Sequence, residues 1–174
     1  LEMSLDDEIV RIATAVEPDM VTLVPERRQE VTTEGGLDVV SQGDRIDSVV
    51  EKFAAKEIPV SLFVDPDQRQ LERASDSAAE MVELHTGAYA NASGEECNNE
   101  LEKLTKGASI ARELDLTVNA GHGLTYSNVA PVVNKLFPHE LHIGHSIVSR
   151  AIFVGVKNAV KEMKEIIFKT KVSR

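Results

Sequence analysis

Histidines set among glycines or small polar residues follow two short apolar runs of the chain. Gly121-His122-Gly123 follows the run 116–120, and Ile143-Gly144-His145-Ser146 closes the run 140–144. Histidine titrates near neutral pH and can give or take a proton there. Glycines on both sides allow the backbone to take positive φ and to approach a ligand closely. We therefore expect His122 to transfer protons; the alternative is a turn with an incidental surface histidine.

The segment around Gly144 has the composition of an anion site. It opens a helical stretch with a glycine and a small polar residue, Ser146. Backbone N–H groups are exposed at such a helix start, and the helix dipole favours an anion there. We expect Gly144 and His145 to contact a phosphate group; the alternative is ordinary helix capping by Ser146.

Two carboxylates stand inside predicted strands, Glu2 in the run 1–5 and Glu83 in the run 81–85. If the predicted strands form a barrel and these side chains face its lumen near the rim, either carboxylate could act as a base with a raised pKa. The alternative for each is an ion pair with a lysine or arginine. Together with His85, His122 and His145 they could instead bind a metal, but no close His-x-x-x-His spacing supports this. His142 receives no role and could simply pack beside the last strand.

A long charged loop spans residues 26–36 and ends in Gly35-Gly36. It could be an active-site lid with the two glycines as its hinge. The alternative is a solvated surface loop. Cys97 lies in a helical stretch rich in Glu and Asn and does not have the setting of a nucleophile.

The elements that must position these residues alternate between strand and helix. Strand-type apolar runs occur six times, with helical periods between them, at 1–5, 20–24, 59–64, 81–85, 116–120 and 140–144. This alternation predicts a parallel sheet with right-handed crossovers, and no Gly-x-Gly-x-x-Gly follows a strand to favour a dinucleotide fold. Polar residues cluster directly after the strands, which is the catalytic face of a barrel.

The predicted fold is α/β, a TIM-type (β/α)8 barrel of which about six units fall in this chain. Residues 1–174 form one partial barrel domain in this interpretation, and the last two strands are strands seven and eight of the barrel. Helical stripes are expected to pack in the core, among them Ile9, Ile12, Ala13 and Val16 in one helix and Val156, Ala159, Val160, Met163 and Ile167 in the last helix.

Composition narrows the class of protein. The chain has 174 residues, of which 42% are hydrophobic, and this is enough for one sizeable core. The formal net charge of −10 argues against nucleic acid or an acidic membrane surface as the main partner. A single cysteine indicates a reducing compartment, and no apolar run is long enough to span a bilayer.

Long motifs in this sequence resemble those of the pyridoxine 5′-phosphate synthase family. The resemblance runs in order over essentially the whole chain, in the segments 23–39 (LVPERRQEVTTEGGLDV), 60–65 (VSLFVD), 83–90 (ELHTGAYA), 118–126 (VNAGHGLTY) and 141–145 (LHIGH). It implies condensation of 3-amino-2-oxopropyl phosphate with 1-deoxy-D-xylulose 5-phosphate to give pyridoxine 5′-phosphate, phosphate and water. It also implies a cytoplasmic homo-oligomer, typically an octamer, with no metal or organic cofactor.

The resemblance assigns a role to each matching residue. Glu2 matches a general base, His122 the proton donor and Glu83 the carboxylate that stabilises the transition state. The contact to deoxyxylulose phosphate is matched by Thr32, and the contacts to the aminoketone phosphate are matched by Gly123, Gly144 and His145.

The family fold begins with two further βα units, which carry an Asn-x-Asp-His motif and another catalytic histidine. We expect the isolated 174-residue chain to be inactive and poorly folded, because two strands of the barrel wall would be open. Another phosphosugar-handling barrel and a non-catalytic barrel scaffold are the alternatives. Strand ends without lysine disfavour an aldolase, and the presence of Glu2, Glu83 and His122 disfavours a scaffold.

Overall fold

The computed structural model describes residues 1–25 and 35–172. Six strands form one parallel sheet in chain order, namely β1 (Glu2–Met3), β2 (Val21–Leu23), β3 (Val60–Val64), β4 (Met81–His85), β5 (Thr117–Gly121) and β6 (Leu141–His142). Eight helices are described with them, namely α1 (Asp7–Val16), α2 (Gly43–Ala54), α3 (Gln68–Asp76), α4 (Gly87–Asn91), α5 (Gly94–Glu113), α6 (Val129–Leu136), α7 (His145–Val154) and α8 (Val156–Val172). The predicted α/β fold with six parallel strands is confirmed.

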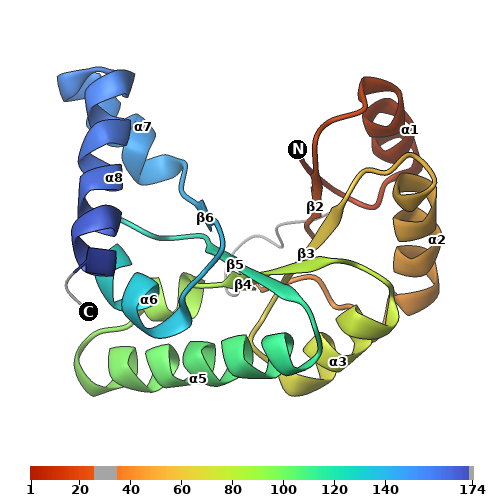
Figure 1. Ribbon diagram of the computed structural model, residues 1–174, viewed down its shortest axis with the longest axis horizontal. Coiled ribbons are helices and arrows are strands. Elements are labelled where there is room, and N and C mark those ends of the chain that lie inside the picture. The colour runs from red at the N-terminus through yellow and green to blue at the C-terminus, as the bar shows by residue number, and fades with distance from the viewer. Residues whose placement is uncertain (26–34, 173–174) are drawn as a thin grey trace.

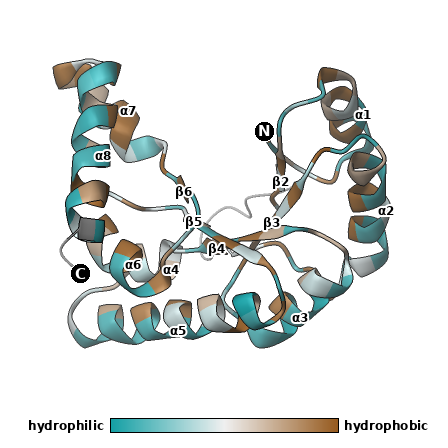
Figure 2. Cartoon of the chain, viewed as in Figure 1, coloured by the Kyte–Doolittle hydropathy of each residue, from teal (hydrophilic) through white to brown (hydrophobic). Residues whose placement is uncertain are grey.

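The sheet is curled, and the helices follow the outside of the curve (Figure 1). One row of strand side chains packs against these helices in the hydrophobic core, including Leu23, Leu62, Leu84 and Ala120. The hydropathy of the chain matches this layering, because the strands are largely hydrophobic and α3 and α5 are largely hydrophilic (Figure 2). The strands therefore lie between a helical layer and the inner side of the curve.

The other row of strand side chains is largely polar. Successive side chains of a strand point to opposite faces, so the residues between the core positions turn to the inner side. They are buried although they are polar, and they comprise Thr22, Ser61, Glu83, His85 and Asn119. The register places Glu83 beside Asn119, and Gly121 between His85 and His142. Buried polar side chains are costly unless they have hydrogen-bond partners. A row of them on the inner side of the sheet is therefore where an active site is expected.

Side-chain caps begin two helices directly after strand ends or short turns. Asp6 accepts hydrogen bonds from the backbone N–H groups of Glu8 and Ile9, and Asp67 accepts them from Arg69 and Gln70. A capping aspartate satisfies amides that the helix leaves unpaired. The chain consequently turns from strand to helix within a few residues, which holds the strand-end side chains in place.

The expected burial of two helical stripes is partly wrong. In α1 the buried residues are Val10 and Ala13, whereas Ile12 is 45% exposed and Val16 is 64% exposed. Helix α1 lies beside the edge strand β1 and has a neighbouring helix, α2, on one side. Its other flank is therefore open to solvent.

The opposite edge of the sheet shows the same pattern. Helix α7 follows the edge strand β6, and its Ile152 and Phe153 are 79% and 81% exposed. In α8, Val156 and Val160 are exposed, although Ala159 and Met163 of the same predicted stripe are buried as expected. Within the described residues, no helix is long and apolar enough to cross a membrane.

The helix layer should carry much of the stability of the fold. We expect Leu104→Ala, at a side chain of α5 that is 2% exposed, to lower the free energy of unfolding by about 2–5 kcal/mol because it leaves a cavity. Glu102→Ala is the matched control on the exposed side of the same helix and should change it by less than about 0.5 kcal/mol. Urea unfolding of the intact protein measures both, and equal effects would contradict the packing.

Candidate active site

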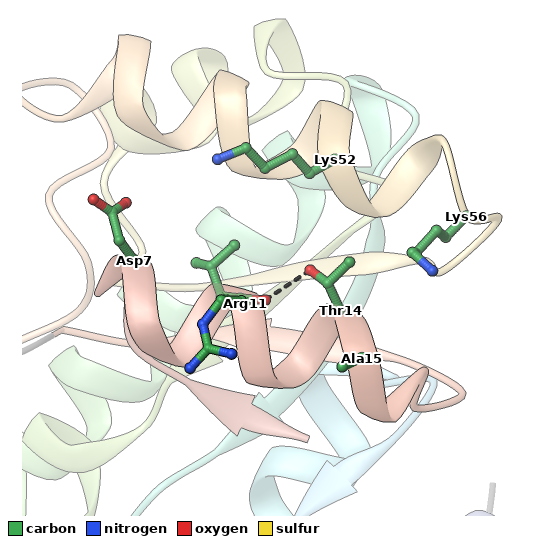
Figure 3. Close-up of a pocket in the computed structure, with 7 residues that line it drawn as sticks. Asp7, Arg11, Thr14, Ala15, Lys52 and Lys56 are labelled. Atoms are coloured by element: carbon green, nitrogen blue, oxygen red, sulfur yellow. Dashed lines mark hydrogen bonds between the residues drawn. The ribbon is translucent and has the colours of Figure 1, made fainter.

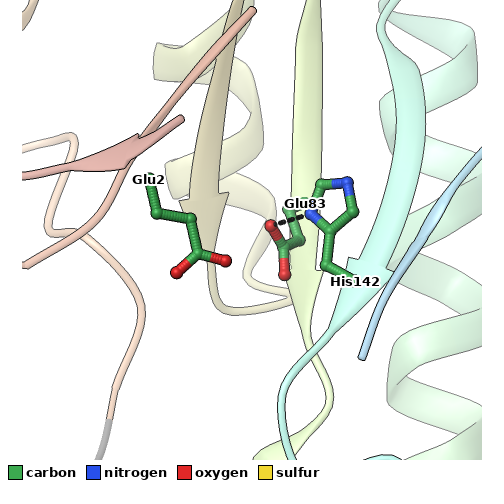
Figure 4. Close-up of side chains that lie close together, drawn as sticks. All are labelled: Glu2, Glu83 and His142. Carbon is green, nitrogen blue, oxygen red and sulfur yellow. Dashed lines mark hydrogen bonds and ion pairs between the residues drawn. The ribbon is translucent and has the colours of Figure 1, made fainter. Parts of the chain in front are cut away.

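Three side chains from separate strands meet on the inner side of the curled sheet (Figure 4). Glu2 comes from β1, Glu83 from β4 and His142 from β6, and each offers a ligand or proton-transfer atom within 4.8 Å of the other two. The pair in direct contact is Glu83 Oε2 and His142 Nδ1, at 2.5 Å. The curl of the sheet thus brings together residues that are 140 positions apart in the chain.

Gly121 makes room for the Glu83 carboxylate. A Cβ at position 121 would lie 2.0 Å from Glu83 Oε1 and 2.9 Å from the carbonyl oxygen of His142. The glycine is thus required by close packing, whereas the sequence suggested a positive φ there. Positive φ occurs instead at His122 (78°) and at Gly123 (75°).

The pKa of His142 is raised. The hydrogen bond to Glu83 is the largest cause, burial opposes it, and the nearby charges of Glu83 and Glu140 add to the rise. An imidazolium is favoured beside carboxylates because the opposite charge stabilises it. The expected alternative for Glu83, an ion pair with lysine or arginine, is wrong among the described residues, where its charged partner is a histidine.

A second cluster surrounds His122. The rings of His85 and His122 are 5.0 Å apart between centroids and nearly perpendicular, and Phe63 lies against both rings. His85 is buried and its Nδ1 is 2.8 Å from Asp65 Oδ1. His122 is therefore part of a packed aromatic group, and the alternative of an incidental surface histidine is wrong.

Asp65 connects this cluster to residue 36. Burial alone would raise the pKa of Asp65, but hydrogen bonds from His85 and from the backbone N–H of Gly36 outweigh it and lower the pKa. Gly36 packs closely against the end of β3, because a Cβ there would lie 2.4 Å from the Asp65 nitrogen. The carboxylate is therefore held ionised between a strand-end histidine and the segment before α2.

The backbone of His122 is fixed by Thr86. The Thr86 hydroxyl lies 2.7 Å from the carbonyl oxygen of Gly121 and 2.5 Å from that of His122. A non-glycine residue at positive φ is uncommon and needs such support. The support comes from the turn after β4, so the ends of β4 and β5 orient this histidine together.

The start of α7 remains suited to an anion. Gly144 is its N-cap residue, no side chain of the described residues caps the helix, and both Gly144 and His145 are exposed. Ser146 does not cap the helix, because its hydroxyl donates to the carbonyl of Leu124 at 2.8 Å. The expected alternative is therefore wrong, and the serine instead ties α7 to the loop after β5.

Some residues that the sequence placed in the site lie outside the part of the chain that the structure describes. Thr32 and positions 26–34 of the proposed lid lie outside the described residues. The metal alternative with His85, His122 and His145 is not supported, because the described residues that could hold an ion are Glu2, Glu83 and His142. In that group the imidazole Nδ1 bonds the Glu83 carboxylate directly. The sequence reasoning missed His142 and the pairing of Asp65 with His85.

A basic hollow lies between α1 and α2 (Figure 3). It is lined by Arg11, Lys52 and Lys56 together with Asp7 and Thr14. Lys56 is paired with Glu17, and Arg11 lies 3.9 Å from Glu8. This hollow is on the helical side of the sheet, so it is separate from the inner polar row.

The comparisons with known proteins agree with this geometry. A family model described as pyridoxal phosphate biosynthesis protein PdxJ matches residues 1–169. The chain belongs to this family. It is 56% identical over 167 residues to a protein named pyridoxine 5′-phosphate synthase from Parasynechococcus marenigrum (strain WH8102), and these residues cover 96% of this chain and 67% of that protein. A namesake from Synechococcus sp. (strain RCC307) is 53% identical over 96% of this chain and 66% of its own length.

The chain therefore spans about two thirds of the length of these relatives. The resemblance to the pyridoxine 5′-phosphate synthase family is confirmed, and the other barrel enzymes and the non-catalytic scaffold are not favoured. A solved structure, the crystal structure of the Amycolatopsis orientalis BexX/CysO complex, contains a chain that matches with a TM-score of 0.60 at 8% identity. That match covers 96% of this chain and 63% of the other, and it shows a shared fold alone.

The close packing at Gly121 can be tested. We expect Gly121→Ala to displace the Glu83 carboxylate and to lower kcat/KM of the intact protein on the order of 10²-fold, since misplacing a reacting group by about 1 Å has that effect. Ser109→Ala is the control, because Ser109 is exposed on the outer helix α5, and kcat/KM should stay near wild type. Normal activity of Gly121→Ala would contradict a role for this carboxylate position.

Proposed function

We propose that this chain forms the larger part of a pyridoxine 5′-phosphate synthase. The amine of 3-amino-2-oxopropyl phosphate would add to the ketone of 1-deoxy-D-xylulose 5-phosphate and lose water as the imine forms. Inorganic phosphate and a second water then leave, and ring closure gives pyridoxine 5′-phosphate. The observation that carries the proposal is the convergence of two carboxylates and an imidazole on the inner face, in a chain of this family.

The proton transfers of this reaction fall to residues at separate strand positions. Glu2 is exposed on β1 and serves as general base, and His122 serves as proton donor at the end of β5. Glu83 is buried and stabilises the charged transition state with its carboxylate. General acids and bases contribute most when they are positioned within reach of the reacting atoms, and three strands supply these groups to one face.

The residues proposed to contact phosphate groups follow β5 and β6 in the chain. Gly144 and His145 begin α7, whose first-turn amides suit a phosphate group, and Gly123 follows the proton donor directly. Thr32 is proposed for the second substrate on the resemblance alone. Residues of this chain supply all of these roles, and the proposal includes no metal or organic cofactor.

We further propose that residues 1–174 are one domain that closes into an eight-stranded barrel with the rest of the intact protein. Edge strands β1 and β6 each pair on one side only among the described residues. The exposed apolar residues of α1 and α7 flank these same edges, which supports further βα units at both. The intact protein is proposed to be a cytoplasmic homo-oligomer, an octamer as in the family, that binds small phosphorylated substrates.

The proton-donor role of His122 has a direct test. His122→Asn in the intact protein should lower kcat for pyridoxine 5′-phosphate formation by about 10²–10⁴-fold, the usual contribution of a general acid. His139→Asn is the control, because His139 is an exposed histidine without a proposed role. Product formation is followed by chromatography from both substrates. Turnover of His122→Asn equal to that of the control would remove His122 from proton transfer.

Barrel closure predicts where charge is not tolerated. Ile12→Asp should destabilise the intact protein by more than about 2 kcal/mol if a further unit covers this side chain, since it would bury an unpaired charge. Arg11→Asp, at the neighbouring exposed position of α1, should have a much smaller effect. Denaturant unfolding measures the free energy of unfolding of both variants. Equally small losses in the two variants would contradict closure at β1.

A further inference from the structure

We propose that His142 is a positioning residue of the active site, which holds the Glu83 carboxylate in one orientation and supplies its counter-charge. This inference rests on the proposed synthase function and adds a residue to which no role was assigned. His142 acts through Glu83 and contacts no reacting atom in this scheme.

The first support is the burial of the carboxylate. Glu83 lies in the middle of the central strand β4, and its side chain is 4% exposed. A buried carboxylate without a partner is strongly disfavoured in its charged form and becomes protonated instead. Among the described residues its charged partner is His142, which bonds Oε2 through Nδ1 at 2.5 Å. A neutral Glu83 would stabilise positive charge poorly, so this imidazole determines whether the carboxylate can act.

The second support is geometric. Oε2 is bonded to Nδ1, and Oε1 lies over Gly121, where a side chain would collide with it. The carboxylate is thus held on two sides by residues that neighbour each other in the register of β5 and β6. An electrostatic group aimed before the reaction needs no reorganisation during it. The pair therefore holds Glu83 facing Glu2 across the inner side of the sheet.

The third support is the charge around the imidazole. Three acids face His142 from different parts of the fold, namely Glu83 from β4, Glu2 from β1 and Glu140 directly before β6. Glu140 Oε2 lies 3.4 Å from Nε2, on the opposite side of the ring from Glu83. Both nitrogens thus have an acceptor, which is the pattern of a doubly protonated ring. The pKa of His142 is raised accordingly, first by the hydrogen bond to Glu83.

The kinetic test uses His142→Asn and His142→Phe in the intact protein. Asparagine keeps a neutral donor near the Nδ1 position, and phenylalanine keeps the ring without a donor. We expect kcat to fall about 10-fold for asparagine and 100-fold or more for phenylalanine, with KM within about three-fold for both. His139→Asn, in the same segment before β6, should match wild type.

The pH profile separates positioning from mere structure. His142→Asn removes the positive charge beside the buried Glu83 carboxylate and so disfavours the ionised form of this side chain. The acid limb of kcat against pH, where activity falls as the pH is lowered, should therefore move to higher pH in His142→Asn. A variant with lower kcat and an unmoved acid limb would overturn the counter-charge role. Wild-type kcat in both variants would overturn the whole inference.

A second measurement does not depend on turnover. Titration of the His142 ring by NMR should give a pKa above the ordinary value of about 6.5 in the intact wild-type protein and a lower one in Glu83→Gln. A pKa that Glu83→Gln leaves unchanged would overturn the pairing. If the pairing is seen but the wild-type protein forms no pyridoxine 5′-phosphate, the proposed function fails and the reaction role of His142 fails with it.

Discussion

The alternation of side chains along buried parallel strands is the constraint on which the rest of this structure depends. Helices cover the outer face of the sheet, so every second strand residue must be apolar, as Leu62 and Leu84 are. The residues between them are also buried, yet they include Glu83, His85 and Asn119. Burying polar groups costs free energy unless they pair. The inner face therefore contains paired polar groups, such as Glu83 with His142 and His85 with Asp65, and this pairing orients the side chains that can do chemistry.

Glycines provide the space that this close packing of polar groups requires. Gly121 leaves space for the Glu83 carboxylate, and Gly36 allows the segment before α2 to lie directly on the end of β3. Gly87 serves the second cluster, because a Cβ there would lie 2.3 Å from His85 Nε2 and 3.1 Å from the His122 ring. All three are close-approach positions, where any side chain would push apart groups that must touch. At Gly123, which also packs closely, a positive φ adds a second requirement.

The two edges of the sheet are less well covered than its interior strands. Among the residues that the structure describes, the ladder of hydrogen bonds ends at β1 and β6, and the helices beside them, α1 and α7, expose apolar side chains that interior helices bury. Yet Glu2 and His142, which belong to these two edge strands, carry atoms within 4.8 Å of each other. The curl is thus strong enough to bring both edges to one interior, which is what a closing barrel requires.

The sequence by itself determined the strand and helix order, since short apolar runs and stripes of period 3.6 are local signals. It also singled out Glu2, Glu83 and His122, because polar residues inside or directly after apolar runs have few structural explanations. It could not decide the partners: Glu83 and His142 are 59 positions apart, and only the register of β4, β5 and β6 makes them neighbours. Burial of the stripe in α1 was decided in the same way. Helical period places apolar residues on one face, but whether that face is covered depends on which elements pack beside it.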